Sequence, residues 1–496
     1  MSRELKTLLK HGSVYTFGII LGRLVSFLMI PLYTNYLTAA DYGVLQLLAT
    51  TIDIVSTVFG VGLSTAMVRS FHQTEDEAEK RRVVSTALVG AVTLMGTVAG
   101  ICLLFAPQFS QLLFHSNDNA YLFRIMFISM FLSSGIELPM VFLRVKLRSG
   151  RFVLISLLKT TVQLSLNIYF LVVLNQGVAG ILYSTLISSL IFIAYLGITT
   201  FREVGFRFEF AKYRAMLSFG APLIISDVSA FIMTYSSRYF LNYLANLTVV
   251  GLYSLAFNFG MVLSQLLNAP FMSIWGTEMF KYAKLPDGKA IFSKILNYYL
   301  LVALFVTLGL SLLTRDALRI MSKPEFWSAY KYVSLISISY ILFGVMYIAG
   351  AGILIMGKSK YRAISTALAA VANLILNFVL IPPFGGFGAA LAAVGSFLVR
   401  VVIDIYYSQK LFPVTYDLRR VVHMSVIFTV LLLAAIGVQI ENLWLSILFN
   451  IGVVLLFPLL VYATGVLTAE EKYWARRLIK NPIAALGALR SRESVG

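Results

Sequence analysis

The 496-residue sequence has little of what soluble enzymes and secreted domains depend on. Only 12% of its residues are charged and 59% are hydrophobic, whereas charged residues make up roughly 25% of an average soluble domain. It has a single cysteine, Cys102, so no disulfide bond can form within one chain. These shortages exclude a disulfide-stabilised secreted domain and indicate a membrane protein.

Catalytic and metal-binding motifs are also missing from the sequence. Its four histidines form no spacing typical of a metal site: they are His11, His72, His115 and His423. There is no P-loop, no HExxH zinc motif and no GxSxG nucleophile elbow. A membrane glycosyltransferase would need a catalytic domain in a sizeable loop, and the apolar runs leave only short loops. We therefore expect no enzyme activity, no metal and no cofactor.

Long apolar runs are what the sequence has in abundance. A bilayer is crossed by about 20 apolar residues in a helix. By that length we expect fourteen transmembrane helices in an all-α polytopic fold. They are predicted near residues 12–36, 43–70, 82–106, 121–147, 152–175, 178–199, 215–242, 248–280, 293–313, 329–355, 361–381, 386–410, 419–438 and 442–464.

The basic residues orient these predicted helices. The chain has 40 lysines and arginines against 22 acidic residues, a net charge of +18. With the N-terminus inside, the outer connections hold only Arg124, Arg315, Arg319, Lys323 and Lys331. Cytoplasmic loops collect Lys and Arg, so both termini are expected in the cytoplasm. The excess charge is thus an orientation signal that also contacts anionic lipid head groups, and nucleic acid is not an expected partner.

Two parts of the sequence repeat each other. The paired positions are Asn35 and Asn242, Gly43 and Gly251, Gly177 and Gly386, and the segments 164–167 ("LSLN") and 374–377 ("LILN"). They are separated by a nearly constant 207 to 210 residues. This repeat predicts two six-helix lobes, 1–205 and 206–412, related by a parallel pseudo-twofold axis along the membrane normal.

The rest of the chain is predicted as an addition to the two lobes. Residues 413–466 supply two further transmembrane helices, and 467–496 form a basic amphipathic tail on the inner leaflet. Paired lobes of this kind enclose a central cleft, which rocking exposes to alternate sides of the membrane.

Several segments resemble a known family in the right order. They are "GRLVSFLMIPLYTNYLTAADYGVLQLL", "GLSTAMVRSF", "NAPFMSIWGTEMFKYA", "GILIMGKSKYRAIS" and "NLILNFVLIPPFGGFGAALAAVGS". Over roughly residues 10 to 410 the chain resembles the polysaccharide (O-antigen-type) flippases of the multidrug, oligosaccharidyl-lipid and polysaccharide exporter superfamily. The resemblance implies movement of undecaprenyl-diphosphate-linked oligosaccharide from the inner to the outer leaflet of a bacterial or archaeal plasma membrane. It also implies polysaccharide polymerase or export proteins as candidate partners.

Two other functions remain open at this point. A cation-coupled multidrug exporter of the same superfamily would favour acidic residues in its cleft, whereas the first predicted helix offers Arg23 and no acid. A flippase for the cell-wall lipid precursor would also fit fourteen helices, and the sequence does not separate it from the first reading.

Charged residues inside predicted helices are the candidate site residues, because such residues usually face protein or water. Arg23, Arg238 and Lys159 are the candidate cations for a diphosphate, since guanidinium and ammonium groups donate to phosphate oxygens. Asp53 is placed with them, as a structural partner of Arg23 on the next helix. For Lys159 the alternative is a side chain that reaches back to the cytoplasmic surface.

Two acidic residues are candidates for coupling transport to a cation. Asp227 lies deep in the seventh predicted helix, and Glu137 lies two residues before Pro139 in the fourth. The alternative for Glu137 is a buried, hydrogen-bonded carboxylic acid. Arg400 and Asp404 have the i,i+4 spacing of a helix salt bridge, and we interpret them as a structural pair.

Overall fold

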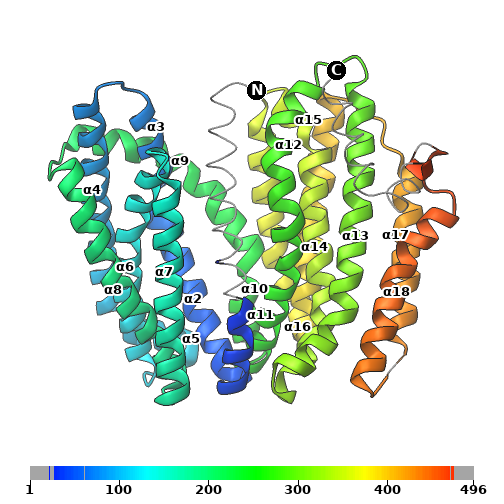
Figure 1. Ribbon diagram of the computed structural model, residues 1–496, viewed down its shortest axis with the longest axis horizontal. Helices are drawn as coiled ribbons and strands as arrows, with labels where there is room; N and C mark the ends of the chain where they lie inside the picture. Colours follow the sequence, from blue (N-terminus) through cyan, green and yellow to red (C-terminus); the bar gives the residue numbers. More distant parts are fainter. Residues whose placement is uncertain (1–21, 23–26, 61, 439, 470, 474–496) are drawn as a thin grey trace. The chain divides into compact units, whose positions relative to one another are not determined.

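The computed structural model describes residues 22, 27–60, 62–438, 440–469 and 471–473, and every regular element among them is a helix. Eleven of the described helices are long and apolar enough to cross a membrane, or twelve if the bent helix α9 (Phe210–Tyr235) is one span. Figure 1 shows the chain as long helices. The chain is therefore an all-α, multi-pass membrane protein.

The predicted number of fourteen spans stays a prediction. Helix α16 (Ser359–Leu411) counts once, although the chain turns within it at Gly385, whose φ is 53°. That turn separates the predicted spans 361–381 and 386–410 because glycine adopts positive φ without strain. Most of the first predicted span, 12–36, lies outside the described residues.

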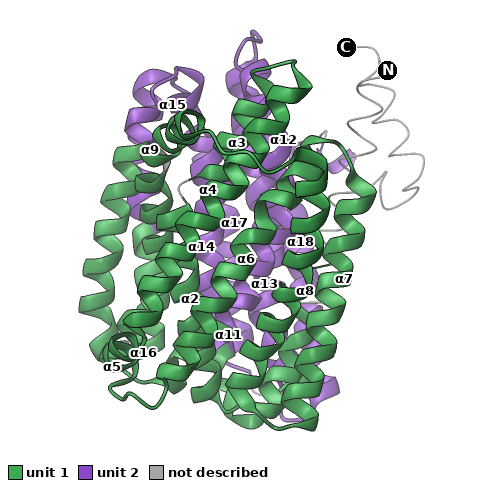
Figure 2. Cartoon of the chain, turned by 90° about the vertical axis from the view of Figure 1, so that its left-hand side faces the viewer, with its two compact units in different colours: residues 1–255, 321–329, 363–396 green, residues 256–320, 330–362, 397–496 purple. Residues whose placement is uncertain are grey.

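Helices pack into two compact units, coloured separately in Figure 2. Unit 1 comprises residues 1–255, 321–329 and 363–396, and unit 2 comprises residues 256–320, 330–362 and 397–496. This division follows packing within the chain, whereas the predicted lobes 1–205 and 206–412 follow a sequence repeat. The lobe boundaries therefore stay a prediction.

Unit 1 is built around α6, which packs against α4 and α8. Its fully buried aromatic residues on α6 are Phe123 and Phe127. The unit contains α2 (Ala39–Gly60), α3 (Leu63–His72), α4 (Glu77–Leu104), α5 (Ala106–Phe114), α6 (Ala120–Val145), α7 (Ser149–Ile168), the π-helical turn Tyr169–Val173, α8 (Gly177–Val204), α9 and α10 (Ser237–Leu244). It also holds the start of α11 (Leu247–Leu263), the 3-10 helix Pro324–Ala329 and residues 363–396 of α16.

Unit 2 has its own apolar core, in which Trp275, Phe292, Tyr299 and Phe457 are buried. It contains the end of α11, the π-helical turn Ser264–Asn268, α12 (Ala269–Tyr282), α13 (Gly288–Met321, whose last residue belongs to unit 1), α14 (Tyr330–Ala349), α15 (Ala351–Ile355), the ends of α16, α17 (Leu418–Ile436) and α18 (Leu443–Ala463). The last two helices match the two that the sequence adds after the repeat.

In unit 1 the helices α2 and α11 cross at two glycines that the sequence pairs with each other. A Cβ atom on Gly43 would lie 2.1 Å from the carbonyl oxygen of Leu247, and one on Gly251 would lie 2.0 Å from that of Ala39. Exchanging the two helices reproduces the same contact, as a twofold relation between equivalent residues requires. Only glycine allows this approach of two backbones. We call this end of unit 1, where α2 and α11 begin, the crossing end.

Adding a methyl group at the crossing should destabilise the protein. We expect Gly43→Ala and Gly251→Ala each to cost about 1–3 kcal/mol, because the new Cβ atom forces the backbones apart. The two effects should not add, since one separation of the helices relieves both clashes. Unfolding midpoints of the detergent-solubilised chain measure this.

The matched control for that series is Gly100→Ala, because no atom lies within 4 Å of a Cβ atom built there. Its midpoint should equal or exceed that of the wild type. Wild-type midpoints for both crossing variants would show that the close approach is not required.

Candidate functional site

Arg238 and Asp53 are brought together in unit 1 from helices far apart in the sequence. Arg238 on α10 is only 3% exposed, and its Nε donates a hydrogen bond to Ser254 Oγ at 3.0 Å. Its guanidinium carbon lies 5.1 Å from the centre of the Tyr235 ring. Asp53 on α2 is exposed and lies within electrostatic range of Arg238. The sequence placed Asp53 beside Arg23 and gave no sign of this neighbour.

The structure says less about the other two predicted cations, Arg23 and Lys159. Arg23 lies outside the described residues, so its predicted contacts with Asp53 and with substrate stay predictions. Lys159 on α7 is half-buried. Its ten-residue distance from the start of α7 corresponds to about 15 Å at 1.5 Å per residue.

Three carboxylates of unit 1 are exposed in the interior of their helices. Asp53 lies 14 residues into α2, Glu137 lies 17 residues into α6, and Asp227 lies 17 residues into α9. At 1.5 Å per residue these positions are about 10–12 Å from the nearer ends of their helices. Charged groups within membrane-spanning helices usually face protein or water, so we expect these exposed carboxylates to face water.

Glu137 borders a cavity of unit 1. The cavity has a volume of about 170 Å³ and lies between α2, α3, α4 and α6. Ser64 on α3 donates a hydrogen bond to Glu137 across it. Asp227 lies five residues after Pro222, beyond a 43° bend of α9. The two predicted coupling residues are thus both exposed in unit 1, on separate helices.

A cavity of unit 2 is lined differently. Its volume is about 560 Å³, and its walls come from α13, α14, α16 and α17 and the segment between the last two. Leucine, isoleucine and valine supply most of the lining, and no charged residue does. This cavity suits an apolar chain and cannot hold a diphosphate, which needs cations.

Arg400 and Asp404 also lie in unit 2. The Nε atom of Arg400 is 3.9 Å from Oδ2 of Asp404, and the two residues are 8% and 1% exposed. A Cβ atom on Gly350 would lie 3.2 Å from that of Asp404, so the pair is packed closely against the turn between α14 and α15.

A buried aspartate that the sequence reasoning missed joins α18 to α13. Asp316 is 1% exposed and accepts hydrogen bonds from Ser446 Oγ at 2.9 and 3.0 Å and from Asn450 Nδ2 at 2.8 Å. The sequence contains a signal for this contact. Ser446 and Asn450 are four residues apart in an apolar helix, so they share one face and could hydrogen-bond to a buried partner.

A second missed group lies in unit 1, around Asn373. Its Oδ1 accepts a hydrogen bond from Ser236 Oγ at 2.8 Å, and its Nδ2 donates to Ser396 Oγ at 3.1 Å. Asn377 donates to the backbone and side-chain oxygens of Asn373. These buried amides hold the two arms of α16 to the end of α9, as polar residues commonly do between membrane helices.

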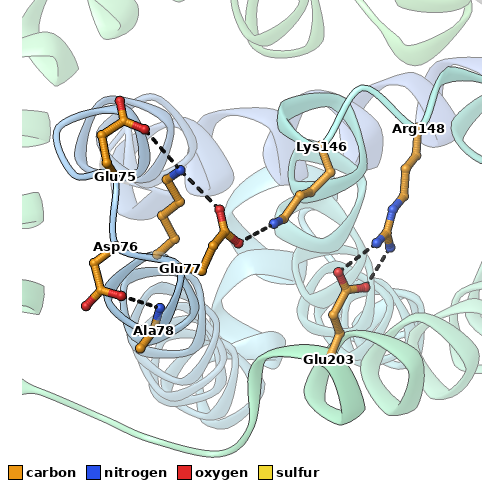
Figure 3. Close-up of polar contacts among 8 residues, drawn as sticks. Glu75, Asp76, Glu77, Ala78, Lys146, Arg148 and Glu203 are labelled. Carbon is orange, nitrogen blue, oxygen red and sulfur yellow. Dashed lines mark hydrogen bonds and ion pairs between the residues drawn. The ribbon is translucent and has the colours of Figure 1, made fainter.

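At the opposite end from the crossing, ion pairs connect the loops of unit 1 (Figure 3). Lys146 Nζ lies 2.8 Å from Glu77, and Lys80 bridges Glu77 and Glu75. The guanidinium of Arg148 makes two hydrogen bonds to Glu203, at 2.6 and 2.8 Å. We call this the ion-pair end, made of the connections 73–76, 146–148 and 205–209.

The connection between α8 and α9 carries a further ion pair at this end. A hydrogen bond from Lys212 holds the pKa of Glu209 below its usual range, and the charges of Lys212, Arg82 and Arg207 add to this effect. The carboxylate is therefore ionised at neutral pH. Its contribution to stability is lost only when acidification carries the pH down through that lowered pKa.

Removing the Asp316 carboxylate should loosen α18 from α13. We expect Asp316→Leu to cost about 1–3 kcal/mol or more, because Ser446 and Asn450 would then keep buried donors without their acceptor. The triple variant with Ser446→Ala and Asn450→Leu should recover part of the loss, since no donor is left stranded. Unfolding midpoints in detergent measure both.

Asp287→Ala is the matched control, because Asp287 lies in the exposed turn before α13. It should leave the midpoint unchanged. An Asp316→Leu protein as stable as the wild type would show that the contact does not hold α18 in place.

Comparisons with known proteins agree on one family. Residues 8–275 match the family described as polysaccharide biosynthesis protein. The "Probable low-salt glycan biosynthesis flippase Agl15" of Haloferax volcanii is 21% identical over 456 residues, which cover 90% of this chain and 92% of that protein.

Solved structures of two transporters share the fold. A structure of the lipid II flippase MurJ in an inward closed conformation has a TM-score of 0.74 at 14% identity, over 91% of this chain and 99% of that one. An inward-facing multidrug resistance MATE family transporter of the MOP superfamily has a TM-score of 0.64 at 16% identity, over 78% and 94%.

Proposed function

Because the chain belongs to the polysaccharide biosynthesis protein family, we propose that it is a flippase for lipid-linked oligosaccharide. It moves an undecaprenyl-diphosphate-linked glycan from the inner to the outer leaflet of a bacterial or archaeal plasma membrane by alternating access. The name of the Haloferax volcanii relative supports this assignment, and so does the transporter fold.

The substrate sets the physical requirement. Moving an unpaired hydroxyl or charge of a diphospho-sugar into hydrocarbon costs several kcal/mol of free energy. The prenyl chain is itself apolar and dissolves in hydrocarbon without this cost. The protein must therefore supply a wet, polar surface at bilayer depth that the head group can reach while the chain stays in lipid. The exposed Asp53, Glu137 and Asp227 indicate that parts of unit 1 are wet within its membrane-spanning helices. The observation that carries the proposal is the family match over residues 8–275.

The crossing end of unit 1 is closed in this state. Besides the two glycines, the Thr34 Oγ1 and Asn35 Nδ2 atoms donate to the carbonyl oxygen of Met321, at 3.2 and 3.1 Å. The ring of Tyr42 meets that of Phe326 edge-on, with centroids 6.0 Å apart. The distribution of basic residues supports an outer position for this end. In that orientation the state described is shut to the outside, and transport requires these contacts to open.

The diphosphate would be held by cations. Arg23 and Arg238 are the principal candidates, with Lys159, because bidentate guanidinium groups match phosphate oxygens. Arg238 is buried between Ser254, Tyr235 and its acidic neighbour Asp53 in this state. Its contact with the substrate therefore belongs to the state that is open at the crossing end, where a diphosphate replaces Asp53 as its partner.

A multidrug exporter is the second candidate function. The exposed carboxylates of unit 1 favour it, because an acidic surface attracts organic cations. A flippase for the cell-wall lipid precursor is the third, since that substrate carries the same diphosphate and prenyl chain. Polysaccharide polymerase or export proteins are the partners expected for the first function, with membrane lipids around the helices.

Substitution of Arg23 separates the first two functions. We expect both Arg23→Ala and Arg23→Lys to lower flipping of the host's lipid-linked oligosaccharide at least tenfold, because neither residue makes the bidentate contact. Flipping is measured in proteoliposomes as access of a glycan-cleaving enzyme or lectin added outside.

Arg151→Ala is the control, since Arg151 is exposed near the start of α7. It should flip at the wild-type rate. Undiminished flipping by both Arg23 variants would remove the diphosphate role, and efflux of an organic cation by the wild type without any glycan flipping would favour the exporter.

A further inference from the structure

The helical run is interrupted between α2 and α3, beside Glu137. Helix α2 ends at Gly60, the backbone of Gly62 is left-handed with φ 56°, and α3 begins at Leu63. Ser64 therefore lies in the first turn of α3, and its hydroxyl donates to the Glu137 carboxylate from α6. The Ser64 hydroxyl and the Glu137 carboxylate thus meet at the start of α3.

The cavity at this break is lined by further hydroxyl groups. Besides Ser64, the side chains of Ser56, Ser133 and Ser134 border its roughly 170 Å³, and Glu137 supplies the single carboxylate. A cavity with several polar groups can hold ordered water, whereas apolar cavities stay dry. Water can therefore reach Glu137 inside the membrane-spanning length of α6.

A second cavity shares Ser64 with the first and lies toward the ion-pair end. Its volume is about 430 Å³, and its lining residues include Ser64, Thr65, His72 and Arg144. Ser64 borders both cavities. From Glu137 to Val145 is eight residues of α6, or about 12 Å at 1.5 Å per residue. The two cavities thus follow α6 from Glu137 to its last turn.

We propose that Glu137 is the binding site of the proton that couples to transport, and that the two cavities joined at Ser64 connect it with water at the ion-pair end. This inference rests on the proposed flippase function, for which it names the coupling ion and its route. When ionised, Glu137 accepts the Ser64 hydrogen bond; when protonated, it is neutral and can enter a drier state of unit 1 at lower cost.

The charged groups around the route include a single carboxylate on the cavity walls. Among the described residues no three His, Cys, Asp or Glu side chains gather as metal ligands. On the cavity walls the titratable groups are Glu137, His72 and Arg144. The neighbouring helices carry further charged residues outside the cavity walls. These are Asp53 on α2, Arg69 on α3, and Arg151 and Lys159 on α7. The charged residues of α4 and α8 lie at 77–82 and 202–203, at the ion-pair end. A single carboxylate suffices for a proton.

Titration of the carboxyl groups tests the site without any lipid-linked substrate. Infrared difference spectra of the reconstituted chain between neutral and acidic pH report each protonated carboxyl group. We expect Glu137→Gln to remove one carboxyl group per chain from this signal. Replacing potassium by sodium should not change this result.

Thr65→Cys tests the route in a Cys102→Ala background, because Thr65 is exposed in the second cavity. A membrane-impermeant maleimide should label it from the ion-pair side and not from the other. Glu203→Gln is the matched carboxyl control: it removes an ion-paired group of that end and should leave the Glu137 signal in place.

Flipping in proteoliposomes then connects the site to transport. An imposed pH gradient should stimulate wild-type flipping of the host's lipid-linked oligosaccharide, and in Glu137→Gln the ratio of rates with and without the gradient should fall to one. An unchanged ratio, a Glu137 signal shifted by sodium, or labelling of Thr65→Cys from the far side alone would each overturn the proposal. A wild-type chain that titrates as expected but flips nothing would instead contradict the flippase function.

Discussion

Polar and charged groups within a bilayer must find a partner in the protein or in water, and this constraint explains most of what distinguishes the chain. Asp316 meets it with the hydroxyl of Ser446 and the amide of Asn450. Arg238 meets it with Ser254, the ring of Tyr235 and a nearby carboxylate. Groups that have such partners inside the protein are structural in this state, whatever their chemistry.

Charged groups that stay exposed along membrane-spanning helices require water instead. Asp53, Glu137 and Asp227 belong to this class, and all three lie in unit 1. A cavity of about 560 Å³ in unit 2, by contrast, has no charged residue in its lining. A charged, sugar-bearing head group needs a wet environment, whereas its prenyl chain can stay in the bilayer.

The sequence predicted the helices closely, because apolar runs of about 20 residues and the prolines and glycines between them depend on local chemistry. The turn at Gly385 and the additional helices α17 and α18 fall where the pattern placed them. Contacts between distant segments were not predictable in this way. Such contacts depend on which faces of the helices meet, and a single sequence does not show this directly. Examples are the approach of Asp53 to Arg238, the Asp316 cluster and the break beside Glu137.

We propose that the crossing end must open in each transport cycle. This proposal is tested most directly by tying that end shut through Asn35 and Met321, which lie in hydrogen-bond contact. In a Cys102→Ala background, Asn35→Cys and Met321→Cys can be joined by a short bismaleimide, with each single cysteine variant as control. Flipping of lipid-linked oligosaccharide should stop in the cross-linked protein and persist in the treated single variants. Undiminished flipping by a fully cross-linked chain would contradict the claim.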